Sequence, residues 1–406
     1  MNNDIISIIL NYTSIKTICT TSSVSKKIHN MTKQYVSLYN YTTKIYVKKN
    51  NLQECLSDHI YGDTCFAYCL NNIYKNFSFV NDKHIIKSMH RSIIEKTYYK
   101  FNDGDDYDMI PVNTTHIIFS DTFNRPLDIS HCNVTHIVFG KSFSQRINKN
   151  DLPISVTHIE FGYDFNENVD DLPISITHLY INGVFNGYID YFNKFINLTH
   201  LLLCGRFNNP VDDLPKSLRV LVLESCFNMS INHLPDNLTH LTLGYMFNRF
   251  VSNLPNSLTH LTFSSSPTKI YQDIGFYKPV HFLPKGITHL TFGDAFNKSI
   301  KRLPNGITHL TFGNSFNKTV DKLPSNLKYL KFGNDFNKSI DNLPDSLRYL
   351  YLGENFNRNI DKLPIGLTQL IFHKDSHFDK NIGQLPNKIK KIVYGKYHNH
   401  DIDMIV

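Results

Sequence analysis

The chain has 406 residues, of which 41% are apolar and 19% charged, and its formal net charge is +7. This composition excludes a disordered chain and fits either two ordinary domains or a long repeat array with a small module. Trp is absent, whereas Phe (29) and Tyr (23) are abundant, so the core must be built on Phe. No apolar run is long enough to span a bilayer, and the seven cysteines show no Cys-x-x-Cys pair and no zinc-ligand spacing.

Residues 1–40 are predicted to form a small α-helical module. Ile5, Ile8 and Ile9 repeat at helical spacing and Leu10 follows them, which gives the first helix an apolar face. That face can bind another protein, or it can pack on the rest of the chain. The run is too short for a signal peptide and has no basic region before it.

Residues 41–109 are predicted to be a helical linker that caps the first edge of the following domain, with short helices over 64–77 and 83–99. The acidic stretch 103–108 has some likeness to a calcium-binding loop. It lacks the spacing and the distal Glu of an EF-hand, so a solvated linker is the better interpretation.

From residue 110 to 397 the chain repeats the pattern Leu-Pro-x-x-Leu-Thr-His-Leu-Thr-Phe-Gly-x-x-Phe-Asn-x-x-Ile. About fourteen units follow one another, most of them 20 residues long, and residues 398–406 form a short tail. Self-similarity at this period is typical of a solenoid. The sequence therefore predicts a β-rich, leucine-rich-repeat-like solenoid behind a small α-helical module. The clearest units begin at Leu283, Leu303, Leu323 and Leu343.

Each unit divides into a strand, a turn and an extended return segment. Apolar Leu290 and Phe292 alternate with polar His289 and Thr291, as in a half-buried strand. Gly293 permits a sharp exit, and the proline of Leu-Pro excludes a helix or a central strand from the return segment. One unit cannot bury its own apolar side, so neighbouring units must stack.

Stacking should place equivalent residues of successive units in rows. A row of Phe is expected in the core, and beside it a row of Asn that is buried and hydrogen-bonded to the backbone. Three of these asparagines, Asn297, Asn317 and Asn337, begin glycosylation sequons. A glycan on a buried Asn would disrupt the core, so we expect an intracellular protein of the cytoplasm (the host cytoplasm for a viral protein), with the nucleus also compatible.

A row of histidines occupies one position of the exposed strand face and continues as two tyrosines. Stacked imidazoles without carboxylate or cysteine neighbours do not enclose a metal ion, so neutral rings that hydrogen-bond to one another and to nearby hydroxyls are the better interpretation. We predict that this concave face binds a partner and that the chain holds no metal or cofactor. The predicted contact residues are His158, His178, His200, His240, His260, His289, His309, Tyr329 and Tyr349.

The pattern Leu-Thr-His-Leu-Thr-Phe-Gly-x-x-Phe-Asn-Lys-x-Ile followed by Leu-Pro resembles the FNIP repeat of social amoebae and of giant DNA viruses of amoebae. The resemblance covers 110–397 and implies a leucine-rich-repeat-like solenoid that recognises proteins. Ser144 departs from it in the Asn row, and 264–282 contains an insertion that lengthens one unit to 29 residues.

Residues 4–31 are similar to an F-box, which many FNIP proteins carry at this end. The stretch from Asp4 to Tyr12 resembles the first F-box helix, although the usual Leu-Pro opening and the later Trp are missing. The resemblance implies that Ile5, Ile8, Ile9 and Leu10 bind a Skp1-type adaptor.

Two functions fit these observations, and both make the chain a binding protein with no catalytic residue. The first is the substrate-recognition subunit of a Skp1/cullin-type ubiquitin ligase, and the second is an interaction scaffold without a ubiquitin link. No nucleophile–base pair is present, and no cysteine is followed two positions later by the Asp of the bacterial Leu-Pro-repeat ligases. Residues 283–397 carry a balance of +9 (18 Lys and Arg, 9 Asp and Glu) without an aromatic platform, so an acidic protein partner is favoured over nucleic acid.

Overall fold

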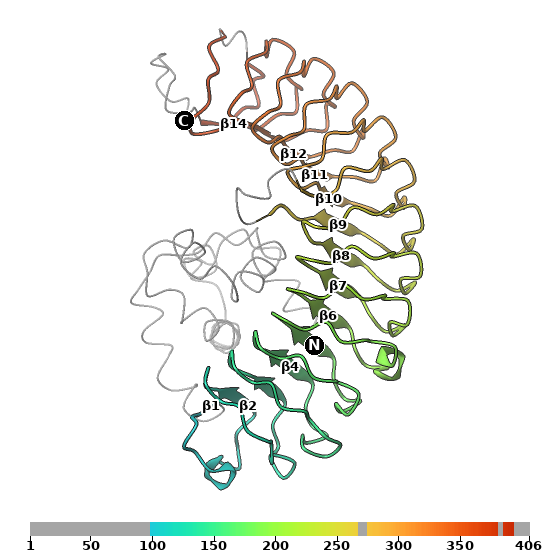
Figure 1. The fold of residues 1–406 in the computed structure, drawn as a ribbon. Coiled ribbons are helices and arrows are strands. Elements are labelled where there is room, and N and C mark those ends of the chain that lie inside the picture. Colours follow the sequence, from blue (N-terminus) through green and yellow to red (C-terminus); the bar gives the residue numbers. More distant parts are fainter. Residues whose placement is uncertain (1–97, 267–273, 381–384, 394–406) are drawn as a thin grey trace, which may run out of the picture.

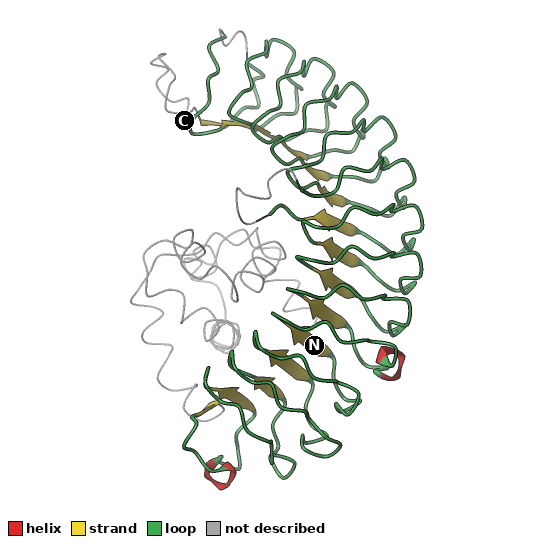
Figure 2. Cartoon of the chain, viewed as in Figure 1, coloured by secondary structure: helices red, strands yellow, loops and turns green. Residues whose placement is uncertain are grey.

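The computed structural model describes residues 98–266, 274–380 and 385–393, and these residues form one curved solenoid. Their sheet contains 15 parallel strands in chain order, each paired with the next. Figures 1 and 2 show an arc whose inner, concave side carries the strands, while loops form the outer side. The strands are β1 (Tyr98–Phe101), β2 (His116–Phe119), β3 (His136–Val138), β4 (His158–Phe161), β5 (His178–Ile181), β6 (His200–Leu203), β7 (Val220–Leu223), β8 (His240–Leu243), β9 (His260–Phe263), β10 (His289–Thr291), β11 (His309–Thr311), β12 (Tyr329–Lys331), β13 (Tyr349–Leu352), β14 (Gln369–Phe372) and β15 (Lys391–Val393).

The alternation of apolar and polar residues in each strand determines which face is buried. Leu290 and Phe292 are each 1% exposed, whereas His289 and Thr291 lie half-buried on the concave side. Strands pair with equivalent residues opposite, for example His289 with His309 and Leu290 with Leu310. A parallel pair in this register repeats every side-chain environment from one coil to the next, which confirms the predicted rows.

The Leu-Pro segments form turns on the outer side of the arc. In the coil that leads into β12, for example, the backbone N–H of Leu327 donates to the carbonyl oxygen of Pro324 at 3.1 Å. Within the described residues, the helical segments are the 3-10 turns η2 (Tyr107–Met109) and η3 (Phe192–Lys194). The expected turn-like return segment is therefore present.

Two columns of apolar side chains rich in stacked phenylalanines run through the core. The inner column lies at the strands and contains both Phe and aliphatic residues such as Leu223 and Leu243, and the outer column is formed mainly by the Phe of the repeated Phe-Asn pair. In one coil the rings of Phe312 and Phe316 lie 3.8 Å apart, and Phe316 lies 6.1 Å from Phe336 of the next coil. The insertion does not break the outer column, because Phe276 stands between Phe247 and Phe296 at 6.3 and 6.0 Å. Phe276 could not be assigned to this row from the repeat pattern, because the insertion shifts it out of the period.

Several of the strands are followed by a glycine, and in these coils the backbone of the preceding coil leaves no space for a Cβ. A Cβ on Gly293 would lie 2.5 Å from the carbonyl oxygen of Ser264, and a Cβ on Gly353 would overlap the backbone of Gly333. At these positions glycine is favoured mainly because the backbone of the preceding coil approaches closely. The sharp turn after the strand, which we expected to be the reason, is less important.

The N-terminal boundary differs from the prediction. Residues 98 and 99, expected to end a helix, belong to strand β1, which pairs with β2 and adds a coil before residue 110. The stretch 103–108 is part of that coil and not a free linker, because Asp103 accepts hydrogen bonds from the hydroxyls of Ser120 and Thr122. The expected helices within 1–97, including the F-box-like module, lie outside the described residues, as do 394–406.

Candidate functional site: the concave face

The histidines of the concave face stack on one another in two runs. The first run contains five rings from His116 to His200, and the second contains four rings from His240 to His309. Neighbouring ring centroids lie 4.0–4.2 Å apart and the ring planes differ by 10–16°. Val220 of β7 separates the runs, and Tyr329 and Tyr349 extend the second one. The prediction that the rings hydrogen-bond to one another was wrong, since they meet face to face.

The residue before each histidine determines its tautomer. The hydroxyl of Thr259 donates to the carbonyl oxygen of Thr239 at 3.0 Å, and its oxygen lies 2.9 Å from Nδ1 of His260. Because the hydroxyl proton is already used, Nδ1 of His260 must carry a proton and donate. This leaves Nε2 as an acceptor. The same Thr–His pair occurs in the coils of His136, His158, His178, His200, His240, His289 and His309.

Burial keeps these imidazoles neutral. Burial first, and then the charges of neighbouring rings, lower the pKa of His158 to about 2 and that of His260 to about 3. Burial likewise lowers the pKa of His240 and His309. A desolvated ring among like rings resists protonation. At neutral pH the predicted contact residues therefore present uncharged acceptors to a partner.

The stacked geometry does not suit a metal ion. The rings of one run are nearly parallel, so their Nε2 lone pairs point in a common direction and do not converge on one centre. Among the described residues there is no group of three or more His, Cys, Asp or Glu side chains that could hold a metal.

The Asn row is hydrogen-bonded as expected, but it is not buried. Oδ1 of Asn317 accepts the backbone N–H of Asn337 at 3.1 Å, and Asn297 does the same for Asn317 at 3.0 Å. These side chains join one coil to the next at its rim, so they are half-buried in the C-terminal coils and exposed in the N-terminal ones. The sequons at Asn297, Asn317 and Asn337 are therefore not buried and give no indication of an intracellular protein.

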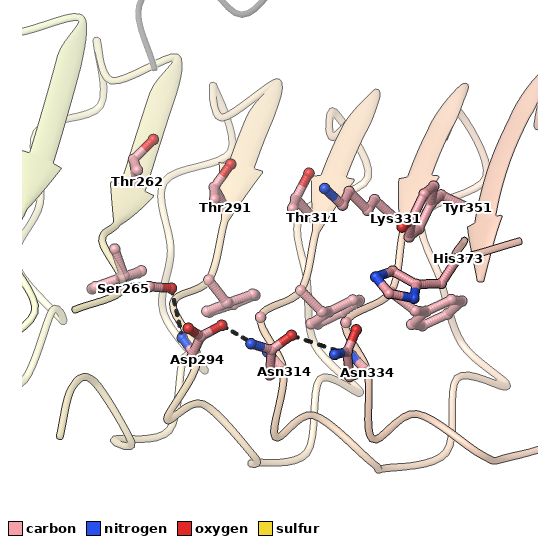
Figure 3. A pocket seen from close by; sticks show the side chains of 16 residues that line it. Thr262, Ser265, Thr291, Asp294, Thr311, Asn314, Lys331, Asn334, Tyr351 and His373 are labelled. Atoms are coloured by element: carbon pink, nitrogen blue, oxygen red, sulfur yellow. Dashed lines mark hydrogen bonds between the residues drawn. The ribbon is translucent and has the colours of Figure 1, made fainter. Parts of the chain in front are cut away.

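The residue two positions after the histidine also lies on the concave face, and its chemical type changes along the arc. The C-terminal half carries Thr262, Thr291 and Thr311, followed by Lys331 and Tyr351. Figure 3 shows these side chains above a second row at the strand ends. In that row Asp294 accepts the N–H of Asn314 at 2.9 Å, and Asn314 accepts that of Asn334 at 3.3 Å. Lys331 was not among the residues predicted for this face, although its place in the Thr row is visible in the repeat.

A parallel sheet of stacked, in-register coils with a turn-like return segment defines a leucine-rich-repeat-like solenoid. Within that class the chain contains FNIP repeats: the FNIP repeat pattern matches residues 132–164 and 227–266 and overlapping segments that cover 279–375. The F-box domain pattern matches residues 1–37, which confirms the resemblance seen in the sequence. No helix in the described part of the chain is long and apolar enough to cross a membrane.

Three solved structures show similarity to this chain. CroV588, described as a novel circular LRR protein, is 31% identical with a TM-score of 0.56, and the match covers 75% of this chain and 57% of CroV588. The internalin InlF of Listeria monocytogenes is 15% identical (TM-score 0.45; 62% of this chain and 79% of that one). YopM of Yersinia enterocolitica is 18% identical (TM-score 0.44; 70% and 61%). A search of curated proteins found no match.

Proposed function

We propose that this protein is the substrate-recognition subunit of a Skp1/cullin-type ubiquitin ligase. The observation that supports this most is the order of parts in one chain: an F-box pattern over 1–37, followed by a solenoid with a continuous concave face. In this role Ile5, Ile8, Ile9 and Leu10 bind the adaptor and the concave face holds the target. The chain itself performs no catalysis, and ubiquitin transfer belongs to the other subunits.

The role requires the Skp1/cullin machinery, so we place the protein in the cytoplasm or nucleus of a eukaryotic cell. The alternative function is an interaction scaffold without a ubiquitin link. Both functions use the concave face, and they differ in whether an adaptor binds the N-terminal segment.

Co-purification of a Skp1-type adaptor from a eukaryotic lysate tests the proposal. We expect the full chain to retain the adaptor and Ile9→Asp to lose it, because a charge on an apolar contact face is strongly unfavourable. Lys318→Asp, which changes an exposed residue of the solenoid, is the control and should retain the adaptor. If the native chain retains no adaptor, the scaffold function replaces the ligase function.

A further inference from the structure

A shallow groove crosses the C-terminal half of the concave face. It has a volume of about 340 Å³ and runs from Thr262 of β9 to Tyr351 of β13 and His373 after β14. The hydroxyls of Thr262, Thr291 and Thr311 line one side of the groove. The row at the strand ends, which consists of Asp294, Asn314 and Asn334, lines the other side (Figure 3). A long, open and mostly polar groove suits an extended chain better than a compact small molecule.

Along the groove, from β9 to β13, Lys331 is the one positively charged residue of its row. Equivalent positions in the neighbouring coils carry Thr291, Thr311, Tyr351 and Ile371, all uncharged. The Lys331 ammonium lies 5.0 Å from the centre of the Tyr351 ring, and the residue is half-buried. It forms no ion pair with any carboxylate of the described residues. Burial lowers its pKa and the charge of Asp294 opposes this, as expected for a cation that still lacks a close anion.

The surroundings add positive charge at longer range. Lys328 and Arg348 are exposed, and each directly precedes a tyrosine of the ring row in the chain. The charge of Lys328 is close enough to help lower the pKa of His309. Asp294, the carboxylate on the groove, already accepts a backbone N–H from Asn314. A second carboxylate, Glu354, accepts a hydrogen bond from Nδ2 of Asn334 at 3.1 Å. The three cations Lys328, Lys331 and Arg348 outnumber these two carboxylates, so the potential around Lys331 favours an anionic group.

The size of the groove limits what it can hold. Five strands at about 4.8 Å spacing span about 19 Å, which corresponds to roughly six residues of extended chain. Peptide N–H and C=O groups can pair with the threonine hydroxyls, which both donate and accept.

We propose that this groove binds an extended, acidic peptide segment of about six residues, with one carboxylate seated on Lys331. The inference deepens the proposed function, on which it rests, by naming the chemical class of target segment that the concave face selects. A single-stranded nucleic acid fits less well. It needs a cation for each successive phosphate and exposed rings for its bases, whereas the row beside Lys331 is neutral threonine.

The test selects heptapeptides from a random displayed library with the full chain, and then measures the affinity of a selected peptide by fluorescence anisotropy. We expect an acidic residue at one constant position. Lys331→Gln should weaken binding at least roughly tenfold, while Lys331→Arg stays within about threefold because it keeps the charge. Lys318→Gln, an exposed lysine outside the groove, is the matched control and should not change the affinity. Lys331→Glu should recover binding with a peptide that carries Lys in place of the acid.

Selected peptides without acidic preference, no selected peptide at all, or equal losses for Lys331→Gln and Lys318→Gln would overturn the proposal. So would a dodecamer of deoxythymidine that binds more tightly than any selected peptide. The adaptor assay is independent of these readouts. If the peptide binds but no adaptor is retained, the ligase function is excluded and the assignment of the groove as a peptide site remains. If the adaptor is retained but no peptide binds, the groove assignment is excluded and the ligase function remains.

Discussion

The hydroxyl oxygen of Thr259 lies 2.9 Å from Nδ1 of His260, so the residue just before strand β9 orients the imidazole that begins the strand. The pairing is visible along the whole array. Every histidine of the row is preceded by Thr, whereas Val220, Tyr329 and Tyr349 are preceded by Arg219, Lys328 and Arg348. The Thr–His pair is therefore one structural unit in these coils, and at Gln369, which continues the row, the preceding Thr368 is kept without the histidine.

Removing this hydroxyl should cost stability. Thr259→Val deletes the hydrogen bonds to the Thr239 carbonyl and to His260, and we expect a loss of about 1 kcal/mol in the free energy of unfolding. Thr262→Val is the matched control, because Thr262 is half-buried on the strand that follows Thr259 and should change stability by less than roughly 0.5 kcal/mol. Chemical denaturation of the two variants measures the difference. Equal midpoints would show that the hydroxyl does not hold the ring.

The histidine row should make the fold sensitive to acid. The folded-state pKa values lie below the unfolded value of about 6.5, with His260 at about 3 and His289 at about 4. Below pH 6.5 the unfolded chain therefore binds more protons than the folded chain. Stability is intact above pH 6.5 and falls as the pH drops, by up to about 1.4 kcal/mol per pH unit for each ring, less where solvent screens a half-buried ring.

The thermal midpoint of the full chain between pH 7.5 and pH 5.0 measures this effect. A variant with Gln at His240, His260, His289 and His309 removes the second run of rings and should show a shallower decline. Gln keeps a neutral side chain that can donate and accept. Parallel pH profiles for the two proteins would mean that these rings titrate alike in the folded and unfolded states.

The Asn row should contribute to stability although it is not buried. Asn317→Ala leaves the backbone N–H of Asn337 without its acceptor, and we expect a loss of about 1 kcal/mol, near the lower end for an unsatisfied group because water can partly replace the amide. Lys318→Ala changes the adjacent exposed residue and should stay within roughly 0.5 kcal/mol. The denaturation midpoints of the two variants provide the comparison. A larger loss for Lys318→Ala would contradict the assignment.

Close packing of the coils can be tested at the glycine position. Gly353→Ala would place a methyl group against the backbone of Gly333, so the coils must shift, and we expect a loss of roughly 1–3 kcal/mol. Gly104→Ala is the control, because no atom lies within 4 Å of its added Cβ. Thermal unfolding of both variants decides the point. If Gly353→Ala is as stable as Gly104→Ala, the coils have more freedom than the structure shows.

The sequence alone determined the solenoid, because the same twenty-residue pattern recurs and each copy contains a strand that cannot bury its apolar face by itself. Leu290 and Phe292 could be assigned to the core, and His289 to the concave face, from alternation within one unit. The F-box resemblance also came from residues 4–31 alone, and its pattern matches residues 1–37. These inferences needed only neighbours within one unit or one short motif.

The tertiary structure decided what each row contacts, because those contacts join residues about twenty positions apart across the gap between coils. The repeat shows that Asn317 and Asn337 are equivalent, but not that they meet at the rim, where solvent reaches them. The face-to-face stacking of His260 on His289 and the place of Phe276 in the core likewise depend on the stacked register. The setting of Lys331 beside Tyr351 follows for the same physical reason: the spacing of about 4.8 Å between coils brings side chains together that no single unit contains.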